Sequence, residues 1–402
     1  MREAGARDRY GHRWLLLLIV LFVAAMLPLV LSLNVWQDET YSLRTTSGDF
    51  AHAFRSAIVF EGLPPFYPLL LECWRALDRS VVFARLLSVL FAAATIWCGW
   101  LFAKRTLPNV PPLAFAFALA ADPFLIYAAL DIRLYALAVL LSGLLFLTFF
   151  DGFFAERPSR RAQYAHAVLA IVGMYTQYFI GALLLGFFIA LLLARRRKAI
   201  GEYVVLGFVV TLASLPIASF LREQLATFRT SSDVVHYSAS SVIVTAFTFA
   251  LPHDWLPQWT HGAGNTIYWI AIAAAAVATL VARPRFGAVL GALATIAFVV
   301  VVFFLTVPIA LHQTLIVPRH LAVLLFPVLA LVFAIFDRLR AGRDRALAVY
   351  LCAYAIFAVL AFVATYARDA KPGDFKHAAA YLESNERPGQ TIYVYDQEMT
   401  TP

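Results

Sequence analysis

Two adjacent carboxylates, Asp38 and Glu39, follow the first apolar stretch of the chain, in the run Trp-Gln-Asp-Glu-Thr-Tyr at 36–41. A carboxylate can take a proton from an attacking hydroxyl or amine, or can orient a neighbouring group that does so. We therefore predict that the pair is catalytic, with Asp38 as the general base and Glu39 as its support. The alternative is an ordinary solvated pair of acids in a loop.

Three arginines would suit a phosphate partner, because a guanidinium offers paired N–H donors to phosphate oxygens. They stand beside apolar stretches, and one of them closes a tight Asp-Ile-Arg turn at 131–133. The predicted substrate-binding residues are Arg85, Asp131, Arg133, Tyr135, Arg319 and Tyr41. The alternatives are that the arginines anchor the chain at the membrane interface, that Asp131 and Arg133 pair with each other, and that the tyrosines belong to an aromatic belt.

The elements that position these residues are predicted to be membrane helices. The chain has 402 residues, of which 62% are hydrophobic and 14% charged, and its mean hydropathy is +0.77. These values indicate an all-α polytopic membrane protein with about 11 transmembrane helices. The first stretch also resembles a signal peptide, but it is too long and lacks a small-residue cleavage site. The predicted spans are 14–33, 80–102, 112–130, 134–150, 165–177, 179–194, 200–220, 266–282, 286–311, 321–336 and 346–366.

Basic residues predict the orientation of these spans. Most of the 32 Lys and Arg residues fall in short segments at the N-terminus and after every second span. By the positive-inside rule these segments are cytosolic, which places Asp38 and Glu39 on the extracytoplasmic face of a multi-pass cell inner (plasma) membrane protein. The net charge of +8 is thereby explained without a nucleic-acid partner.

Two long segments are predicted on the outer face. The first, 34–79, contains two amphipathic pieces at 51–60 and 66–77, which we expect to lie in the interface as helices and to wall a cavity over the acidic pair. The second, 221–265, is predicted to be a structural lid, with acceptor binding as the alternative.

The chain is predicted to divide into a transmembrane domain at 1–366 and an outer tail at 367–402. The tail has a helical pattern at 373–385 and a strand-like alternation at 391–395, an α/β-like arrangement. Because it stops before it could bury a core, it is either truncated or packed on the membrane part.

No protein-built metal site is predicted. The three cysteines are far apart, and the histidines form no His-Glu-x-x-His pattern. The cofactor left open is a divalent cation, Mg²⁺ or Mn²⁺, bound together with a phosphate.

Several motifs resemble one family of membrane enzymes in their order and sidedness. They are WQDETYSL, EGLPPFYPLLLECW, ARLLSVLFAAATIW, DPFLIYAALDIRLYALAVLL, TQYFI and PRHLAVLLFP. Together they resemble the polyprenyl-phosphate-sugar-dependent glycosyltransferases of the GT-C superfamily, in particular the branches that resemble protein mannosyltransferases and the lipid A aminoarabinose or galacturonic acid transferases. The chain departs from the family pattern at Leu63, at 130–132, at Gln177 and at His320.

The resemblance implies a cell-envelope enzyme that moves a hexose or pentose from a polyprenyl-phosphate-linked donor to a glycolipid, polysaccharide or protein acceptor. A single displacement would invert the anomeric centre. Three alternatives stay open from the sequence: a polysaccharide polymerase or ligase that uses the segment 221–265, a lipid-linked sugar transporter or flippase, and a non-catalytic assembly subunit. The sequence does not name the sugar or the acceptor.

Overall fold

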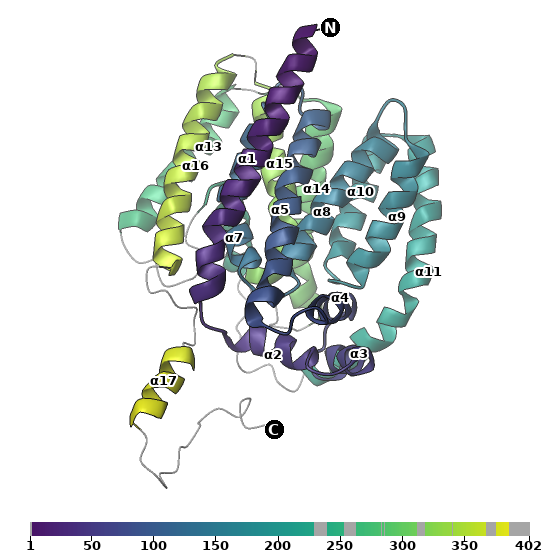
Figure 1. Ribbon diagram of the computed structural model, residues 1–402. Coiled ribbons are helices and arrows are strands. Elements are labelled where there is room, and N and C mark those ends of the chain that lie inside the picture. Colours follow the sequence, from purple (N-terminus) through teal and green to yellow (C-terminus); the bar gives the residue numbers. More distant parts are fainter. Residues whose placement is uncertain are drawn as a thin grey trace.

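The protein is a bundle of helices in the computed structural model, which describes residues 2–228, 239–252, 263–282, 284, 286–311, 318–339, 341–366 and 375–385. Figure 1 shows most of the long helices running side by side, with the N-terminus at one end of the bundle. No strand occurs in these ranges. The predicted all-α membrane fold is confirmed.

Each of the eleven predicted spans coincides with a helix or, in one case, with a bent pair of helices. Seven described helices are long and apolar enough to cross a membrane, or eight if the bent pair counts as one span, and two more are shorter and apolar. Apart from the bent pair, the helices at the predicted spans are α1 (Arg2–Ser32), α5 (Val81–Thr106), α8 (Tyr135–Phe149), α9 (Arg160–Met174), α10 (Ile180–Leu193), α11 (Arg197–Phe228), α13 (Ala263–Ala282), α14 (Ala288–Leu311), α15 (Ala322–Asp337) and α16 (Arg343–Tyr366). One further helix, α12 (Ala239–Ala250), lies in the second outer segment and matches no predicted span.

The predicted span over 112–130 is not one straight helix, because the chain bends there by 63° between α6 (Pro112–Ala121) and α7 (Pro123–Ala129), which together are apolar enough to form one broken span. Asp122 lies at the bend, and its carboxylate accepts a hydrogen bond from the backbone N–H of Leu125 at 3.0 Å. The hydroxyl of Tyr354 donates to the other oxygen at 2.8 Å. Asp122 therefore caps α7. Pro123 suits the first position of that helix, because proline has no backbone N–H and a donor at this position would have no partner within the helix.

Aromatic rings fill the core of the bundle. Phe102 on α5 contacts Phe146 on α8 and Phe326 on α15, with ring centroids 6.0 and 5.3 Å apart. Gly143 allows α15 to approach α8 closely, since a Cβ there would lie 2.8 Å from the ring of Phe326. Such close packing makes the interior of the bundle rigid.

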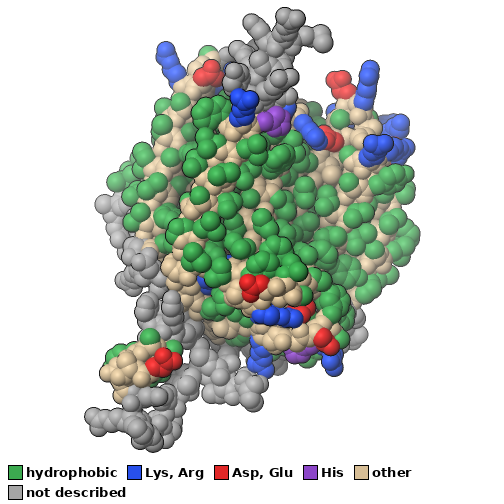
Figure 2. Space-filling view, in the orientation of Figure 1, with side chains coloured by type: hydrophobic (Ala, Val, Ile, Leu, Met, Phe, Trp, Pro, Cys, Tyr) green, Lys and Arg blue, Asp and Glu red, His purple; other side chains and the backbone are tan. Residues whose placement is uncertain are grey.

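Three short helices, α2 (Gln37–Thr45), α3 (Phe50–Val59) and α4 (Phe66–Arg75), lie across the end of the bundle away from the N-terminus. The two helices predicted in the first outer segment are thus present as α3 and α4. α2, which carries the acidic pair, was not predicted. In the same view, Figure 2 shows hydrophobic side chains over the middle of the bundle and charged side chains toward its two ends, as expected of a membrane protein.

The second outer segment and the tail are only partly described. The apolar part of the second segment forms α12, and Tyr268 on α13 donates a hydrogen bond to the carbonyl of Leu251 beside it at 3.2 Å. The tail contains α17 (Phe375–Asn385), at the predicted place. The strand-like run 391–395 and the parts of the second segment at 229–238 and 253–262 lie outside the described residues, so the role of this segment as a lid stays a prediction.

Candidate active site

Glu39 is buried at the start of α2, where its side chain is 0% exposed. Its carboxylate accepts hydrogen bonds from Arg85 at 2.9 and 3.0 Å and from the backbone N–H of Ile132 at 3.2 Å. It also accepts from the backbone N–H of Trp36 at 3.3 Å, which satisfies a donor at the helix N-terminus. Glu39 therefore joins α2, α5 and the turn before α8, and it acts on Asp38 through the backbone.

Arg85 has all five of its N–H donors engaged by protein acceptors. Besides Glu39, it donates to three carbonyls at the end of α1, those of Val30, Leu33 and Asn34, at 3.2, 2.8 and 2.7 Å. A cation is favourable at a helix C-terminus, where carbonyls lack partners. The side chain is 1% exposed. This geometry does not support the prediction that Arg85 binds phosphate, because it leaves the guanidinium no donor to offer.

A second arginine fixes the other end of α2. Arg75 on α4 donates to the carbonyls of Leu43 and Thr46 at 3.0 and 2.8 Å, and also to the Thr46 hydroxyl. Arg79 holds the same Thr46 carbonyl at 2.7 Å and pairs with Glu72. α2 is thus held at both ends, and the position of Asp38 follows from these contacts.

Asp38 lies next to Glu39 but in a different environment. Its carboxylate pairs with Arg319 at 3.0 Å, and the two side chains are 14% and 30% exposed. The guanidinium of Arg319 also lies over the ring of Trp36, 5.3 Å from the ring centroid. The Nε of Arg319 is buried and has no hydrogen-bond partner among the described residues. Asp38 and Arg319 are therefore a charged pair with access to solvent and with donor capacity unused.

Arg133 lies in the turn before α8 and contacts α2 from the other side. Its Nη1 donates to the hydroxyl of Ser42 at 2.9 Å and to the carboxylate of Glu61. In the part of the chain that is described, its Nε has no partner. Burial alone would lower the pKa of Arg133, but the interactions with Glu61 and Tyr135 raise it by more. The pKa of Arg133 therefore lies above its ordinary value, and the group stays charged.

The remaining predicted residues surround this centre. Asp131 accepts a hydrogen bond from the indole N–H of Trp36 at 2.9 Å. The hydroxyl of Tyr41 accepts one from Gln37 at 2.9 Å, and its ring meets Phe60 edge-on. Tyr135 is buried at the start of α8, in electrostatic range of Asp38, Arg133 and Arg319. The structure thus brings Asp38, Arg133, Tyr135 and Arg319 together.

No family model and no curated protein matches the chain. Among solved structures it is similar to ArnT from Cupriavidus metallidurans in the apo state, with a TM-score of 0.56 and 19% sequence identity. The chain has the fold of ArnT. The match covers 87% of this chain and 64% of that protein, so the chain spans about two thirds of the length of ArnT. At this identity the similarity shows the fold alone, and it is the fold expected from the resemblance to the GT-C superfamily.

Sequence reasoning missed three residues of the site: Trp36, Ser42 and Glu61. Glu61 opens the motif EGLPPFYPLLLECW, and its side chain is 1% exposed beside Arg133. A carboxylate in an apolar segment was a readable signal, because buried acids are rare unless they are paired. Trp36 and Ser42 gave no such signal, since their partners lie far away in the sequence.

Two departures from the family pattern meet in space. The side-chain amide of Gln177 donates to the backbone carbonyl of His320 at 3.2 Å. His320 belongs to the short 3-10 helix η3 (Pro318–Leu321), which also carries Arg319. Gln177 therefore helps to fix the backbone from which Arg319 reaches Asp38.

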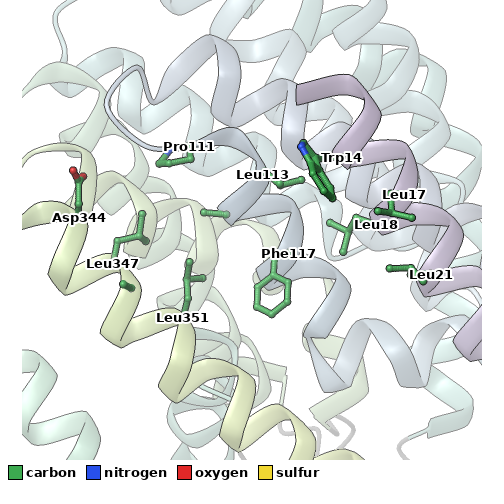
Figure 3. Close-up of a pocket in the computed structure, with 12 residues that line it drawn as sticks. Trp14, Leu17, Leu18, Leu21, Pro111, Leu113, Phe117, Asp344, Leu347 and Leu351 are labelled. Atoms are coloured by element: carbon green, nitrogen blue, oxygen red, sulfur yellow. The ribbon is translucent and has the colours of Figure 1, made fainter. Parts of the chain in front are cut away.

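An apolar groove of about 580 Å³ lies between α1, α6 and α16, and Figure 3 shows its lining. Trp14, Phe117 and Leu351 are typical of that lining, and the charged residue there, Asp344, pairs with Arg343 at 3.1 Å. α16 begins at the end of the bundle opposite α2, α3 and α4. The groove lacks convergent polar groups and is not the candidate active site.

The described residues contain no group of three His, Cys, Asp or Glu side chains placed to hold a metal ion. The prediction of an assisting Mg²⁺ or Mn²⁺ stays untested, and transfer measured in the presence of a chelator would answer it.

Proposed function

We propose that the chain is an integral membrane glycosyltransferase that moves a sugar from a polyprenyl-phosphate donor to an acceptor at the extracytoplasmic face. The pair of Asp38 with Arg319 carries the proposal. It places a carboxylate with solvent access beside a cation with a spare donor, at one end of a membrane bundle. The likeness of the fold to ArnT, a GT-C glycosyltransferase, supports the same class of reaction.

The donor would lie with its lipid tail in the bilayer and its phosphate at the level of α2. Arg319 and Arg133 are the cations we assign to the phosphate, because both keep N–H donors without partners among the described residues. Arg85 is not assigned this role. Tyr41, Asp131 and Tyr135 are proposed to shape the sugar site around these cations.

The proposed reaction is a single displacement. The acceptor hydroxyl or amine attacks the anomeric carbon on the face opposite the phosphate, while the bond from that carbon to the phosphate oxygen breaks. The proton of the acceptor passes to the carboxylate of Asp38, and the electron pair leaves with polyprenyl phosphate. Because phosphate is a good leaving group, no strong general acid is needed. Because the attack comes from the face opposite the phosphate, the anomeric configuration is inverted.

The test is transfer by Asp38→Asn in proteoliposomes, with a panel of polyprenyl-phosphate hexoses and pentoses as donors. Loss of a general base costs about 10²- to 10⁴-fold in rate. We expect a loss of this size without loss of folded protein. Asp78→Asn is the matched control, because Asp78 lies in the same outer segment and, within the described ranges, accepts a hydrogen bond only from the nearby backbone N–H of Ser80, at 2.7 Å. Near-normal transfer by Asp38→Asn would refute the assignment, and a product of retained configuration would refute the single displacement.

A further inference from the structure

We infer that Arg319 is a positioning residue that changes partners during the reaction. It holds Asp38 while the site is empty, and it moves to the donor phosphate when the donor binds, which releases Asp38 to act as the base. The inference rests on the proposed function. It assigns to this site an order of events in which the base becomes available only after the donor has bound.

The contacts of Arg319 are those of a side chain that can move. Of its hydrogen-bonding donors, one on Nη2 is used by Asp38, and the buried Nε has no partner among the residues described. Its guanidinium also lies over the face of Trp36. A cation over an aromatic face is attracted without a fixed hydrogen-bond geometry, so the guanidinium can shift across the ring at little cost.

The other arginines of the site do not have this freedom. All five N–H donors of Arg85 are bonded to the carboxylate of Glu39 or to backbone carbonyls at the end of α1. Arg133 is tied through Nη1 to Glu61 and Ser42, although its remaining donors can still reach a ligand. Arg319 is therefore the cation whose partner among the described residues, the carboxylate of Asp38, a phosphate group can replace.

The ion pair also has a chemical consequence for Asp38. An oxygen that is held by a guanidinium has a lone pair engaged, and its negative charge is offset by the cation. While the pair persists, this oxygen is poorly placed to accept the proton of a hydroxyl. A phosphate that draws Arg319 away leaves the carboxylate charged and unengaged beside the anomeric carbon.

The exchange predicts an effect that a merely structural ion pair would not produce. Asp38 and the donor phosphate compete for the same cation, so the two are coupled negatively. A variant that removes the charge of Asp38 should abolish transfer and yet bind the lipid phosphate more tightly. A variant that removes the cation of Arg319 should bind the lipid phosphate more weakly. In that background, removing the charge of Asp38 should no longer tighten the binding.

The experiment measures binding of polyprenyl phosphate that carries no sugar to the purified full chain in nanodiscs, with the uncharged polyprenol of the same length as the reference probe. The proteins are the wild type, Asp38→Asn, Arg319→Gln and the double variant. Asp38→Ser is a second neutral variant, and thermal unfolding checks that each protein is folded. We expect Asp38→Asn to bind polyprenyl phosphate at least about fivefold more tightly than the wild type, a typical size for coupling between two sites. Polyprenol should bind all five proteins alike.

Equal or weaker binding of polyprenyl phosphate by both neutral variants of Asp38 would overturn the inference. So would an equal gain in the Arg319→Gln background, because direct repulsion between Asp38 and phosphate would then explain it. The proposed function fails in a different way. In that case the wild type does not distinguish polyprenyl phosphate from polyprenol, and the inference falls with it.

Discussion

The adjacent acids Asp38 and Glu39 each pair with an arginine, and the two pairs differ in almost every physical respect. Glu39 and Arg85 are 0% and 1% exposed, and every donor of that arginine is used. Asp38 and Arg319 are 14% and 30% exposed, and the Nε of the arginine has no partner among the described residues. Successive residues on an α-helix point about 100° apart, so one dipeptide can serve the protein interior and an open site at once.

The difference separates a structural contact from a reactive one. Breaking a buried ion pair strands a charge in the interior, which costs about 3–5 kcal/mol. A pair with solvent access contributes roughly 0–1 kcal/mol, because water and side-chain entropy offset its attraction. The pair of Asp38 and Arg319 can therefore be opened by a ligand, whereas the pair of Glu39 and Arg85 holds α1, α2 and α5 together.

The largest expected effect follows from breaking the buried pair. Arg85→Met leaves Glu39 charged in the interior and uncaps the end of α1, so we expect the free energy of unfolding to fall by about 3–5 kcal/mol. Denaturant unfolding in detergent would measure it. The control is Arg105→Met, whose pair with Asp151 is exposed on both sides, with side chains 49% and 35% exposed, and its expected loss is about 1 kcal/mol or less. Equal losses in the two variants would erase the distinction between buried and exposed pairs.

A second variant tests Arg133, which we assign to the donor phosphate together with Arg319. Arg133→Gln removes a cation with donors to spare, and we expect transfer to fall about 100-fold, the cost of losing one donor that stabilises developing charge. Initial rates with a polyprenyl-phosphate sugar would show it. Arg55→Gln on the exposed face of α3 is the control and should transfer normally. If the two variants behave alike, Arg133 is not a phosphate ligand.

The smallest effect is expected at Trp36, which contacts both ion pairs: its backbone N–H donates to Glu39, and its ring lies against Arg319. Trp36→Phe keeps a ring beneath Arg319 but removes the indole donor to Asp131. We expect a loss of about 1 kcal/mol in stability, the net worth of one hydrogen bond, and transfer within about tenfold of the wild type. Unfolding and initial rates measured on the same preparation would check both values. A loss of transfer as large as that of Asp38→Asn would place Trp36 in the chemistry itself.

Hydropathy and prolines were sufficient to predict the spans, α3 and α4, because burial in lipid and in the interface leaves a pattern in the sequence itself. The nine residues of α2 carry no such pattern, and their helix depends on Arg75 and Arg85 from other elements. The bend at Asp122 was readable, since an Asp followed by Pro is a typical helix start.

The partners within the site could not be predicted in the same way. Arg85 and Arg133 both looked like membrane-edge arginines in the sequence. What separates them is the set of acceptors around each one, and those acceptors come from distant elements that only the fold brings together. For the same reason, nothing in the adjacent letters of Asp38 and Glu39 indicated which acid would be buried.

The most direct test of the division between the two acids is transfer per folded molecule for Asp38→Asn and Glu39→Gln, measured side by side. If Asp38 acts as the base and Glu39 only holds α2, the folded fraction of Glu39→Gln should retain transfer within about tenfold, while Asp38→Asn should lose at least about 100-fold at unchanged stability. The reverse pattern, with full transfer by Asp38→Asn and none by folded Glu39→Gln, would contradict the account.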